Sequence, residues 1–312
     1  MCIRDRYRGE GGRPHIVAFR CAHRGTQLST GWVEGDRLRC FYHGWKYDET
    51  GQCVEQPAED ADFARKIRIE SYPVASYLGL IFGYFGEDRP PSLASRPEFE
   101  GEGVLDVGTG KLPYNYFNGV ENSVDEVHVA FVHRDSHFDA SGLHDVPQVS
   151  ASETDYGLEV RAAMPNGVVR IVHLEMPTLI HIKLYPQGGD GEWRDFLSWK
   201  VPIDDVSYRS FFLVKSHASG SAAEQYARDQ KRAGGLVADH EVGPLAEAIL
   251  AGRRQRSFDD IGEAVNLVSL QDFVAQKGQG VIADREHERL GRSDASVILL
   301  RRVWEREMRA IA

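Results

Sequence analysis

Two short segments of the chain each combine a cysteine with a histidine. The first reads Cys21-Ala-His23, and the second, after a further sixteen residues, reads Cys40-Phe-Tyr-His43. Thiolates suit iron–sulfur clusters or zinc, and imidazole suits either. A [2Fe–2S] cluster in which two cysteines bind one iron and two histidines bind the other needs this donor set. Because each segment offers one donor of each kind, the two loops could hold a planar cluster from opposite sides.

The residues around these four ligands suit a buried cluster. Gly25 and Gly44 permit backbone N–H groups to approach sulfur closely. Burial and hydrogen bonds to the sulfurs tune the potential of such a cluster. Nearby aromatic side chains would exclude water: Phe41, Tyr42, Trp45 and Tyr47.

Two other interpretations of the four residues are open at this point. They could be unrelated core residues, or they could bind a structural zinc ion. Zinc knuckles usually pair cysteine with cysteine at short spacing, which this chain does not do. The remaining cysteines lie outside the pattern, and we interpret Cys53 as a structural thiol and Cys2 as incidental.

A second group of residues with metal-binding chemistry lies in a helix predicted over residues 116–134, for which Asn115 is a suitable N-cap. It reads Asp125-Glu-Val-His128-Val-Ala-Phe-Val-His133. In a regular helix the two histidines would point ~140° apart. For both imidazoles to reach one metal ion, we expect the helix to end or to carry a π-type bulge between them. The apolar stripe of this helix would be Val120, Val124, Val127 and Phe131.

A carboxylate would complete a metal site with these histidines. Two histidines and one carboxylate form the facial triad that holds non-haem Fe(II) and leaves positions open for O2. The apolar, helical stretch 264–283 contains one acid, Asp272. Burying an isolated acid is costly unless it is paired or coordinated. The alternative is an exposed acid on an amphipathic helix. Competing acids lie in charged runs: Asp259, Asp260, Asp284 and Glu286.

The elements that must position these groups fall into two regions. Short β-like runs between glycine-rich turns over residues 15–85 indicate a small antiparallel β domain. A linker rich in Pro, Gly and acids follows over residues 87–103. Residues 149–217 indicate a broad antiparallel sheet, with a hairpin signal at Asn166-Gly167, and helices predominate from Ala222 onward. The strand-like runs of the first region are His15–Phe19, Arg37–Phe41, Ile67–Glu70 and Leu80–Tyr84.

Composition narrows the classes of partner. Of the 312 residues, 42% are hydrophobic and 27% charged, and 47 acids against 37 bases give a formal net charge of −10. Nucleic-acid binding needs a basic surface, so we expect no nucleic acid partner and no anionic membrane partner. No apolar run approaches the ~18 residues of a membrane helix, and the first residues lack the apolar region of a secretory signal. We therefore expect a cytoplasmic protein with reduced thiols.

The two patterns together resemble a known family. The cysteine–histidine pattern, followed by Gly44-Trp45, resembles the Rieske [2Fe–2S] signature. The Asp-x2-His-x4-His pattern is similar to the iron motif of the Rieske non-haem iron aromatic ring-hydroxylating oxygenases. Residues 199–205 and 278–294 resemble the phthalate dioxygenase-like branch, so the resemblance to an oxygenase (alpha) subunit covers nearly the whole chain.

This resemblance implies an α+β fold with two domains. A small antiparallel β Rieske domain would occupy residues 1–100, and a helix-grip-like catalytic domain, with a large antiparallel sheet and flanking helices, would occupy residues 101–312. The family has more β structure before the first Cys-x-His than this chain has, so we expect the Rieske domain to be N-terminally truncated. The implied cofactors are the Rieske [2Fe–2S] cluster and a mononuclear Fe(II) bound by His128, His133 and Asp272.

The family also implies roles for two further residues. Asp125 would accept a hydrogen bond from His43 of a neighbouring subunit and from His128 of its own, and would so link the two metal centres. Asn122 would lie near the iron. A link between subunits implies a closed head-to-tail ring, and the family expectation is a homotrimer.

The implied function is that of the oxygenase component of a multicomponent Rieske mono- or dioxygenase. Electrons from NAD(P)H would arrive through a separate reductase, with or without a ferredoxin. O2 would then be used to hydroxylate, dihydroxylate or O-demethylate a small aromatic or related apolar substrate. Two other classes stay open: an electron-transfer protein without iron chemistry and a zinc-stabilised ligand-binding domain. The sequence assigns neither the substrate, the type of oxygenation, the reductase nor the pocket-lining residues.

Overall fold

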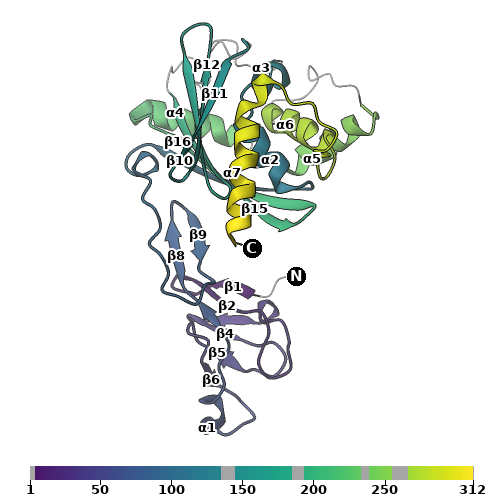
Figure 1. The fold of residues 1–312 in the computed structure, drawn as a ribbon. Coiled ribbons are helices and arrows are strands. Elements are labelled where there is room, and N and C mark those ends of the chain that lie inside the picture. The colour runs from purple at the N-terminus through teal and green to yellow at the C-terminus, as the bar shows by residue number, and fades with distance from the viewer. Residues whose placement is uncertain (1–3, 135–144, 185–192, 233–238, 255–265, 312) are drawn as a thin grey trace. The chain divides into compact units, whose positions relative to one another are not determined.

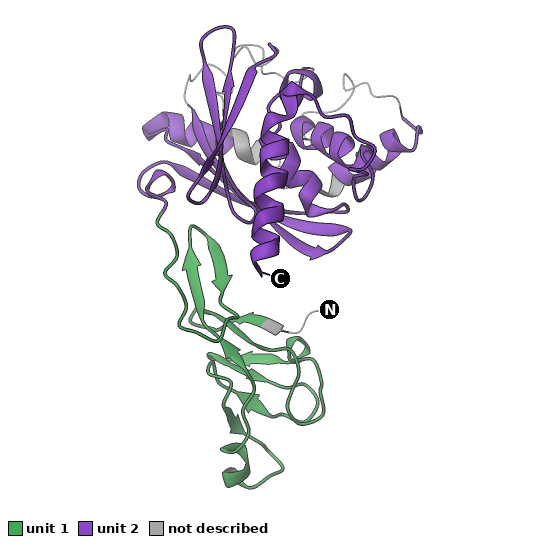
Figure 2. Ribbon diagram, in the orientation of Figure 1, with its two compact units in different colours: residues 1–95 green, residues 96–312 purple. Residues whose placement is uncertain are grey.

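The computed structural model describes residues 4–134, 145–184, 193–232, 239–254 and 266–311. The chain forms two compact units, residues 1–95 and 96–312, and each is described by itself (Figure 2). The division falls inside the predicted linker, between Ser95 and Arg96, whereas we expected it after residue 100.

The described part of the first unit contains three small antiparallel sheets (Figure 1). The strand expected over Ile67–Glu70 is wrong. This segment instead makes isolated bonds to the turn at Gly51, whose carbonyl accepts from the Ile69 N–H at 2.9 Å. The sheets consist of β1 (Arg4–Arg8), β2 (Pro14–Ala18) and β7 (Ser71–Tyr72); of β3 (Trp32–Glu34), β4 (Arg37–Arg39), β5 (Lys46–Tyr47) and β6 (Cys53–Glu55); and of β8 (Val74–Tyr77) and β9 (Leu80–Gly83), with a short helix, α1 (Ala61–Ala64), after β6.

The core of this unit places three cysteines among apolar side chains. Val17, Leu28 and Tyr47 have no exposed surface, and each belongs to one cluster with Leu38 and Trp45. All three cysteines of this cluster are free thiols, which are Cys21, Cys40 and Cys53.

The second unit is built on a seven-stranded antiparallel sheet with the order β10-β16-β15-β14-β13-β12-β11. Strands β11 to β16 neighbour one another in chain order, and β10 lies at the far edge beside β16. The hairpin predicted at Asn166-Gly167 is confirmed: Gly167 has a φ of 87°, and the Val168 N–H donates to Asn166 Oδ1 at 3.1 Å. The strands are β10 (Val104–Leu112), β11 (Gln148–Thr154), β12 (Gly157–Ala163), β13 (Val169–Glu175), β14 (Leu179–Leu184), β15 (Arg194–Asp204) and β16 (Ser207–Ser216).

Helices cover one face of this sheet (Figure 1). Val120 and Val124 of α2 (Tyr116–Val124) and Leu300 of α7 (Ala295–Ile311) are buried against Val172 and Ile180 of the sheet. Full burial of such a side chain contributes about 1.5–3 kcal/mol. The large sheet with flanking helices confirms the expected α+β architecture. The remaining helices are α3 (His128–Val132), α4 (Gly220–Arg232), α5 (Asp239–Leu250) and α6 (Leu267–Gly278). None of the described helices is long and apolar enough to cross a membrane.

The helix expected over residues 116–134 is wrong, because two helices occupy this stretch. Asn115 caps α2 as expected, and its Oδ1 accepts from the Phe117 N–H at 2.9 Å. The chain then leaves helical geometry at Asp125, which is extended with φ −86° and ψ 99°. Its Oδ1 accepts from the Val127 N–H at 3.1 Å, a local bond that competes with continuation of the helix.

The second helix of this stretch, α3, brings the two histidines to its two ends. His128 is its first residue, and His133 lies just beyond its last residue, Val132. The irregularity expected between the histidines is therefore the end of a helix. Phe131, expected in the apolar stripe, is 56% exposed.

Two candidate metal centres

The cysteine–histidine loops of the first unit have matching backbones. In each loop the N–H of the cysteine donates to the carbonyl five residues on, at 2.9 Å for Cys21 and 2.8 Å for Cys40. The N–H of the glycine four residues on donates back to the cysteine carbonyl, at 3.0 Å for Gly25 and 3.1 Å for Gly44. Both glycines have positive φ, 73° and 76°, which favours glycine over residues with a side chain. The same turn therefore presents both cysteines.

The predicted ligands of these loops lie in two contacting pairs, the thiols of Cys21 and Cys40 and the imidazoles of His23 and His43. The rings of His23 and His43 have centroids 4.4 Å apart, and His23 stacks on Trp45 at 4.5 Å. The Nδ1 atom of His23 is buried and has no hydrogen-bond partner in the described part of the chain. An unsatisfied buried nitrogen costs about 1–3 kcal/mol. Coordination of iron by this atom would remove that cost.

The thiols at this centre are set in an apolar surrounding. Burial raises the pKa of Cys21, which also interacts with the thiol of Cys40, and both side chains are almost fully buried. The hydroxyl of Tyr47 lies 3.2 Å from Cys21 Sγ. Metal binding requires thiolates, so an iron pair would supply the positive charge that these buried sulfurs lack. The donor set and its burial fit a [2Fe–2S] cluster.

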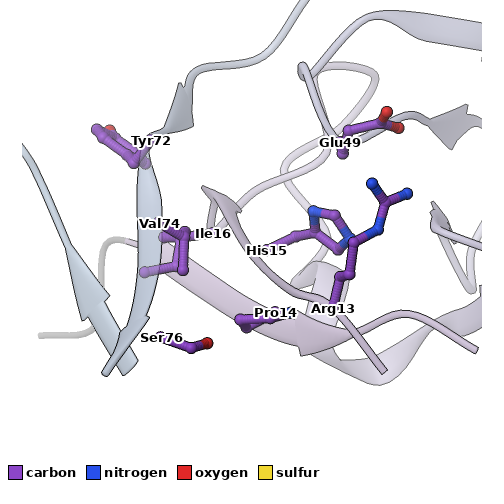
Figure 3. A pocket seen from close by; sticks show the side chains of 8 residues that line it. All are labelled: Arg13, Pro14, His15, Ile16, Glu49, Tyr72, Val74 and Ser76. Carbon is purple, nitrogen blue, oxygen red and sulfur yellow. The ribbon is translucent and has the colours of Figure 1, made fainter. Parts of the chain in front are cut away.

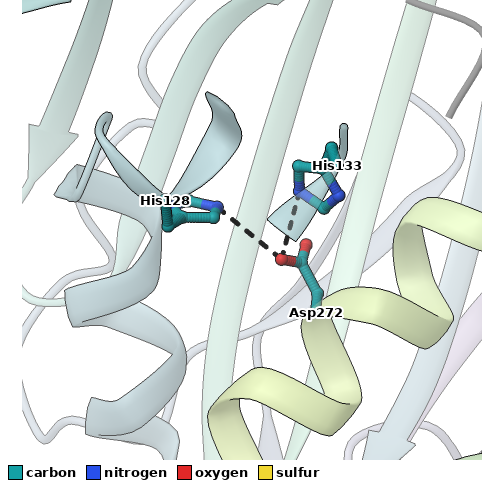
Figure 4. A group of neighbouring side chains, drawn as sticks. All are labelled: His128, His133 and Asp272. Carbon is teal, nitrogen blue, oxygen red and sulfur yellow. Dashed lines mark ion pairs between the residues drawn. The ribbon is translucent and has the colours of Figure 1, made fainter. Parts of the chain in front are cut away.

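The second centre joins two segments far apart in the sequence. The ligand atoms of His128, His133 and Asp272 lie within 4.8 Å of one another. The Nε2 atoms of the two histidines lie 3.7 Å and 3.3 Å from Asp272 Oδ1, and Figure 4 shows Asp272 reaching from α6 toward both rings. Asn266 fixes the start of α6, because its side chain accepts from the Ser269 N–H at 3.1 Å.

The other nitrogen of each imidazole is held by a hydrogen bond. The Nδ1–H of His133 donates to Gln271 Oε1 at 3.0 Å, and the Nδ1–H of His128 donates to the main-chain carbonyl of Asp125. These bonds place a proton on each Nδ1, so that Nε2, the nitrogen facing Asp272, is the atom that a metal ion would take. Metal-binding histidines in proteins are oriented in this manner. The arrangement therefore fits a metal ion held by two Nε2 atoms and one carboxylate.

Electrostatics at this centre favour the ion pair in the protein without metal. Burial raises the pKa of Asp272, but its bond to His133 and the nearby positive charges outweigh this effect, so the pKa lies below its ordinary value. For His133, burial lowers the pKa, but the hydrogen bond and negative charge of Asp272 and the bond to Gln271 together outweigh burial, so the pKa lies above its ordinary value. A divalent cation would take the place of that proton.

The two other predicted site residues lie beside the second centre. Asn122 Nδ2 is 3.3 Å from Asp272 Oδ1 and 3.4 Å from His128 Nε2. The carboxylate of Asp125 is 4.0 Å from His128 Nδ1, so it is the main-chain oxygen of Asp125, and not its side chain, that bonds to His128.

Sequence reasoning missed two residues at the second centre. Gln271 directly precedes Asp272, and its bond to His133 could not be inferred from the sequence. Lys200 lies on β15 and is 8% exposed. Lys200 is two residues after Ser198 in the same strand, so the two side chains face the same side of the sheet. This period of two is the sequence pattern that could have placed Lys200 on that face.

Two cavities lie away from these centres. One of about 280 Å³ in the first unit is lined by side chains that include Arg13, His15 and Glu49 (Figure 3). Another of about 350 Å³ in the second unit is lined by residues of β13 and β14 that include His173 and Lys183. None of the predicted metal ligands lines either cavity.

Known proteins resemble the chain over nearly its full length. The Rieske [2Fe-2S] domain family matches residues 6–77. The oxygenase subunit of 5,5'-dehydrodivanillate O-demethylase from Sphingobium sp. SYK-6 is 30% identical over 98% of this chain and 69% of its own length. The alpha subunit of phenoxybenzoate dioxygenase from Ectopseudomonas oleovorans is 28% identical over 97% of this chain and 73% of its own. Among solved structures, the terminal oxygenase of carbazole 1,9a-dioxygenase from Novosphingobium sp. KA1 superposes with a TM-score of 0.67 at 18% identity, over 95% of this chain and 83% of that one.

The fold and both centres thus define an iron-dependent oxidoreductase. The chain belongs to the Rieske non-haem iron ring-hydroxylating oxygenases, as an oxygenase (alpha) subunit. Its cofactors are a Rieske [2Fe–2S] cluster and a mononuclear iron. The family expected from the sequence is thereby confirmed.

Proposed function

We propose that Cys21, His23, Cys40 and His43 bind the cluster, in a Rieske domain spanning residues 1–100. The observation that supports this assignment is the repeated turn that presents the two cysteines, together with the unsatisfied Nδ1 of His23. Tyr47 and Trp45 exclude water from one side of the site.

In the catalytic domain, residues 101–312, we propose that His128, His133 and Asp272 hold the mononuclear iron. The observation that carries this proposal is the convergence of two Nε2 atoms on Asp272 Oδ1 while each Nδ1 is bonded elsewhere. When bound, the iron supplies oxygen activation and the cluster supplies electrons. The chain orients the imidazoles through Gln271 and through the carbonyl of Asp125.

We further propose that the protein oxygenates a small aromatic or related substrate by hydroxylation, dihydroxylation or O-demethylation. The named relatives act on dehydrodivanillate, phenoxybenzoate and phthalate, which supports this substrate range. Electrons would come from an NAD(P)H-dependent reductase, with or without a ferredoxin. Related oxygenases have been solved in complex with ferredoxin, which supports such a partner.

The assembly that we propose is a closed homotrimer in which Asp125 connects His43 of one subunit with His128 of the next. His43 is exposed, and the carboxylate of Asp125 is 33% exposed, so both could contact a neighbouring subunit. Native mass measurement would test the trimer, and a monomer with full activity would contradict it.

Metal analysis combined with product analysis tests the function. We expect about three irons and about two acid-labile sulfides per chain. His128→Ala should lower the iron content by about one and abolish product while it keeps the cluster absorbance. Cys40→Ser should lose sulfide. Zinc without sulfide would contradict the cluster, and full product formation by His128→Ala would contradict the iron site.

A further inference from the structure

Lys200 is a buried cation on the helix-covered face of the large sheet. Ser198 pairs with Ile180, whose side chain belongs to the core beneath α2 and α7, and Lys200 lies two residues on and faces the same side. A Cβ atom placed on Gly119 of α2 would lie 3.2 Å from Lys200 Cδ. The lysine side chain therefore runs between β15 and α2.

No group in the described part of the chain bonds to this ammonium group. Two other buried cations of the sheet have partners: Lys215 donates to the Gly101 carbonyl at 3.0 Å, and the guanidinium of Arg194 lies over the ring of Tyr226 at 5.0 Å. Burying a charge without a partner is costly, and titratable groups in such surroundings cluster at functional sites. Burial lowers the pKa of Lys200 to about 8, because the opposing effect of the Asp272 carboxylate is smaller. Most of the lysine is still protonated at pH 7.

A glycine in α2, Gly119, leaves room for two neighbouring side chains, Tyr208 and Lys200. A Cβ on Gly119 would also come within 2.5 Å of the Tyr208 hydroxyl, so a side chain there would displace both neighbours. Glycine inside a helix costs about 0.5–1 kcal/mol relative to alanine. Glycine at residue 119 therefore gives room chiefly to the Tyr208 side chain and also to Lys200, at the expense of helix stability.

The ammonium group lies in the same layer as the iron site. Gly119 is one helical turn before Asn122, which contacts both Asp272 and His128. With two neutral imidazoles and one carboxylate, a divalent iron leaves a net charge of +1, and Lys200 raises it to about +2. Hydroxyl groups stand beside the lysine on the same face, since Ser210 pairs with Lys200 and bonds to Ser198 at 3.1 Å. Such a polar, positively charged face suits an anion.

We propose that Lys200 pairs with a carboxylate group of the substrate, so that the enzyme selects aromatic acids over neutral aromatic compounds. This inference rests on the proposed function and narrows its substrate class. The carboxylate would receive a charge-assisted bond from Lys200, and the ring would extend toward the iron.

Matched pairs of acid and amide test this proposal. The probes are benzoate, 4-methoxybenzoate and 3-phenoxybenzoate, each compared with its amide, which has nearly the same shape without the charge. For the wild type with a surrogate reductase, we expect kcat/KM for at least one acid to exceed that for its amide by about 100-fold. Lys200→Met should lower this acid-to-amide ratio to within about threefold of unity. Lys183→Met is the control, because Lys183 is exposed and alternates with Ile182 away from the core.

Equilibrium binding of the same pairs completes the test where no product forms. The inference is overturned if the wild type neither turns over nor binds any acid in preference to its amide. It is also overturned if the acid-to-amide ratio is unchanged in Lys200→Met. Oxygenation of amides as well as acids would overturn the inference while leaving the proposed function intact. A chain that holds no mononuclear iron would instead refute the proposed function.

Discussion

The Nδ1–H of His133 donates to Gln271 Oε1 at 3.0 Å, while the next residue, Asp272, approaches the Nε2 atom of the same ring at 3.3 Å. One turn of α6 thus contacts both nitrogens of the imidazole. The ring is held in a single tautomer, with Nε2 available to a metal.

Gln271→Leu should weaken iron binding, because the imidazole loses the acceptor that fixes its orientation. Loss of such a partner typically lowers metal affinity by 10–100-fold. Chelator titration of the holoenzyme would measure this change, with the cluster absorbance as an internal reference. Gln279→Leu is the control, since this glutamine is exposed just after α6. Equal iron retention in both variants would mean that Gln271 does not orient His133.

Much of the site could be predicted from residue types and spacing. The proposed cluster ligands follow from two loops that each offer a thiol and an imidazole, and the proposed iron ligand Asp272 follows from its isolation in an apolar stretch. The bond between Gln271 and His133 could not be predicted, because it joins residues 138 positions apart.

The break between α2 and α3 was also beyond the sequence pattern. The apolar spacing continues from Val124 to Val127, whereas the backbone turns extended at Asp125, whose side chain accepts a local bond from the Val127 N–H. Lys200 was missed for a similar reason, since its lack of a partner depends on what α2 and α6 place around it.

Tyr47→Phe should lower the reduction potential of the cluster. Burial raises the pKa of Tyr47, so its hydroxyl stays protonated and can donate toward Cys21 Sγ at 3.2 Å. A hydrogen bond to sulfur stabilises the reduced, more negative cluster. A net bond energy of about 1 kcal/mol corresponds to roughly 40 mV for one electron. Redox titration would measure the shift.

Tyr42→Phe is the control for this measurement. It should leave the potential within about 10 mV of the wild-type value, because the Tyr42 side chain is exposed and its hydroxyl faces Arg24. An equal shift in both variants would contradict the role assigned to Tyr47.

Glu121→Gln should destabilise the second unit. This carboxylate is 8% exposed and accepts from Arg285 at 2.7 Å and from Arg301 at 2.6 Å, so it ties α2 to α7. Because the Arg285 and Arg301 side chains are 25% and 24% exposed and Arg301 keeps its pair with Glu288, loss of these charge-assisted bonds should cost about 1.5–3 kcal/mol. The midpoint of urea unfolding should fall accordingly.

Glu305→Gln is the matched control. It removes an exposed pair with Arg309 and should cost at most about 0.5 kcal/mol. Similar midpoints for the two variants would show that the Glu121 network contributes little.

Lys200→Met should stabilise the protein in the absence of substrate. If the lysine served only to stabilise the fold, the same substitution would destabilise the protein. The folded-state pKa of about 8 lies below the ordinary value of 10.5, so the folded chain binds the proton less well than the unfolded chain does. The penalty is complete below pH 8, shrinks as the pH rises from about 8 to 10.5, and vanishes above that range. Its size is on the order of 3 kcal/mol.

Urea unfolding at several pH values measures this penalty as a difference between the wild type and Lys200→Met, which cancels the titration of the other groups. The variant should be more stable at pH 7, and the difference should close by pH 10.5. Lys183→Met should show no such gap, because Lys183 is exposed and its charge is already solvated. A variant less stable than the wild type at pH 7 would make Lys200 a packing residue. If added benzoate stabilises the wild type enough to close its stability difference from Lys200→Met, the cost of the buried charge is directly connected with carboxylate binding.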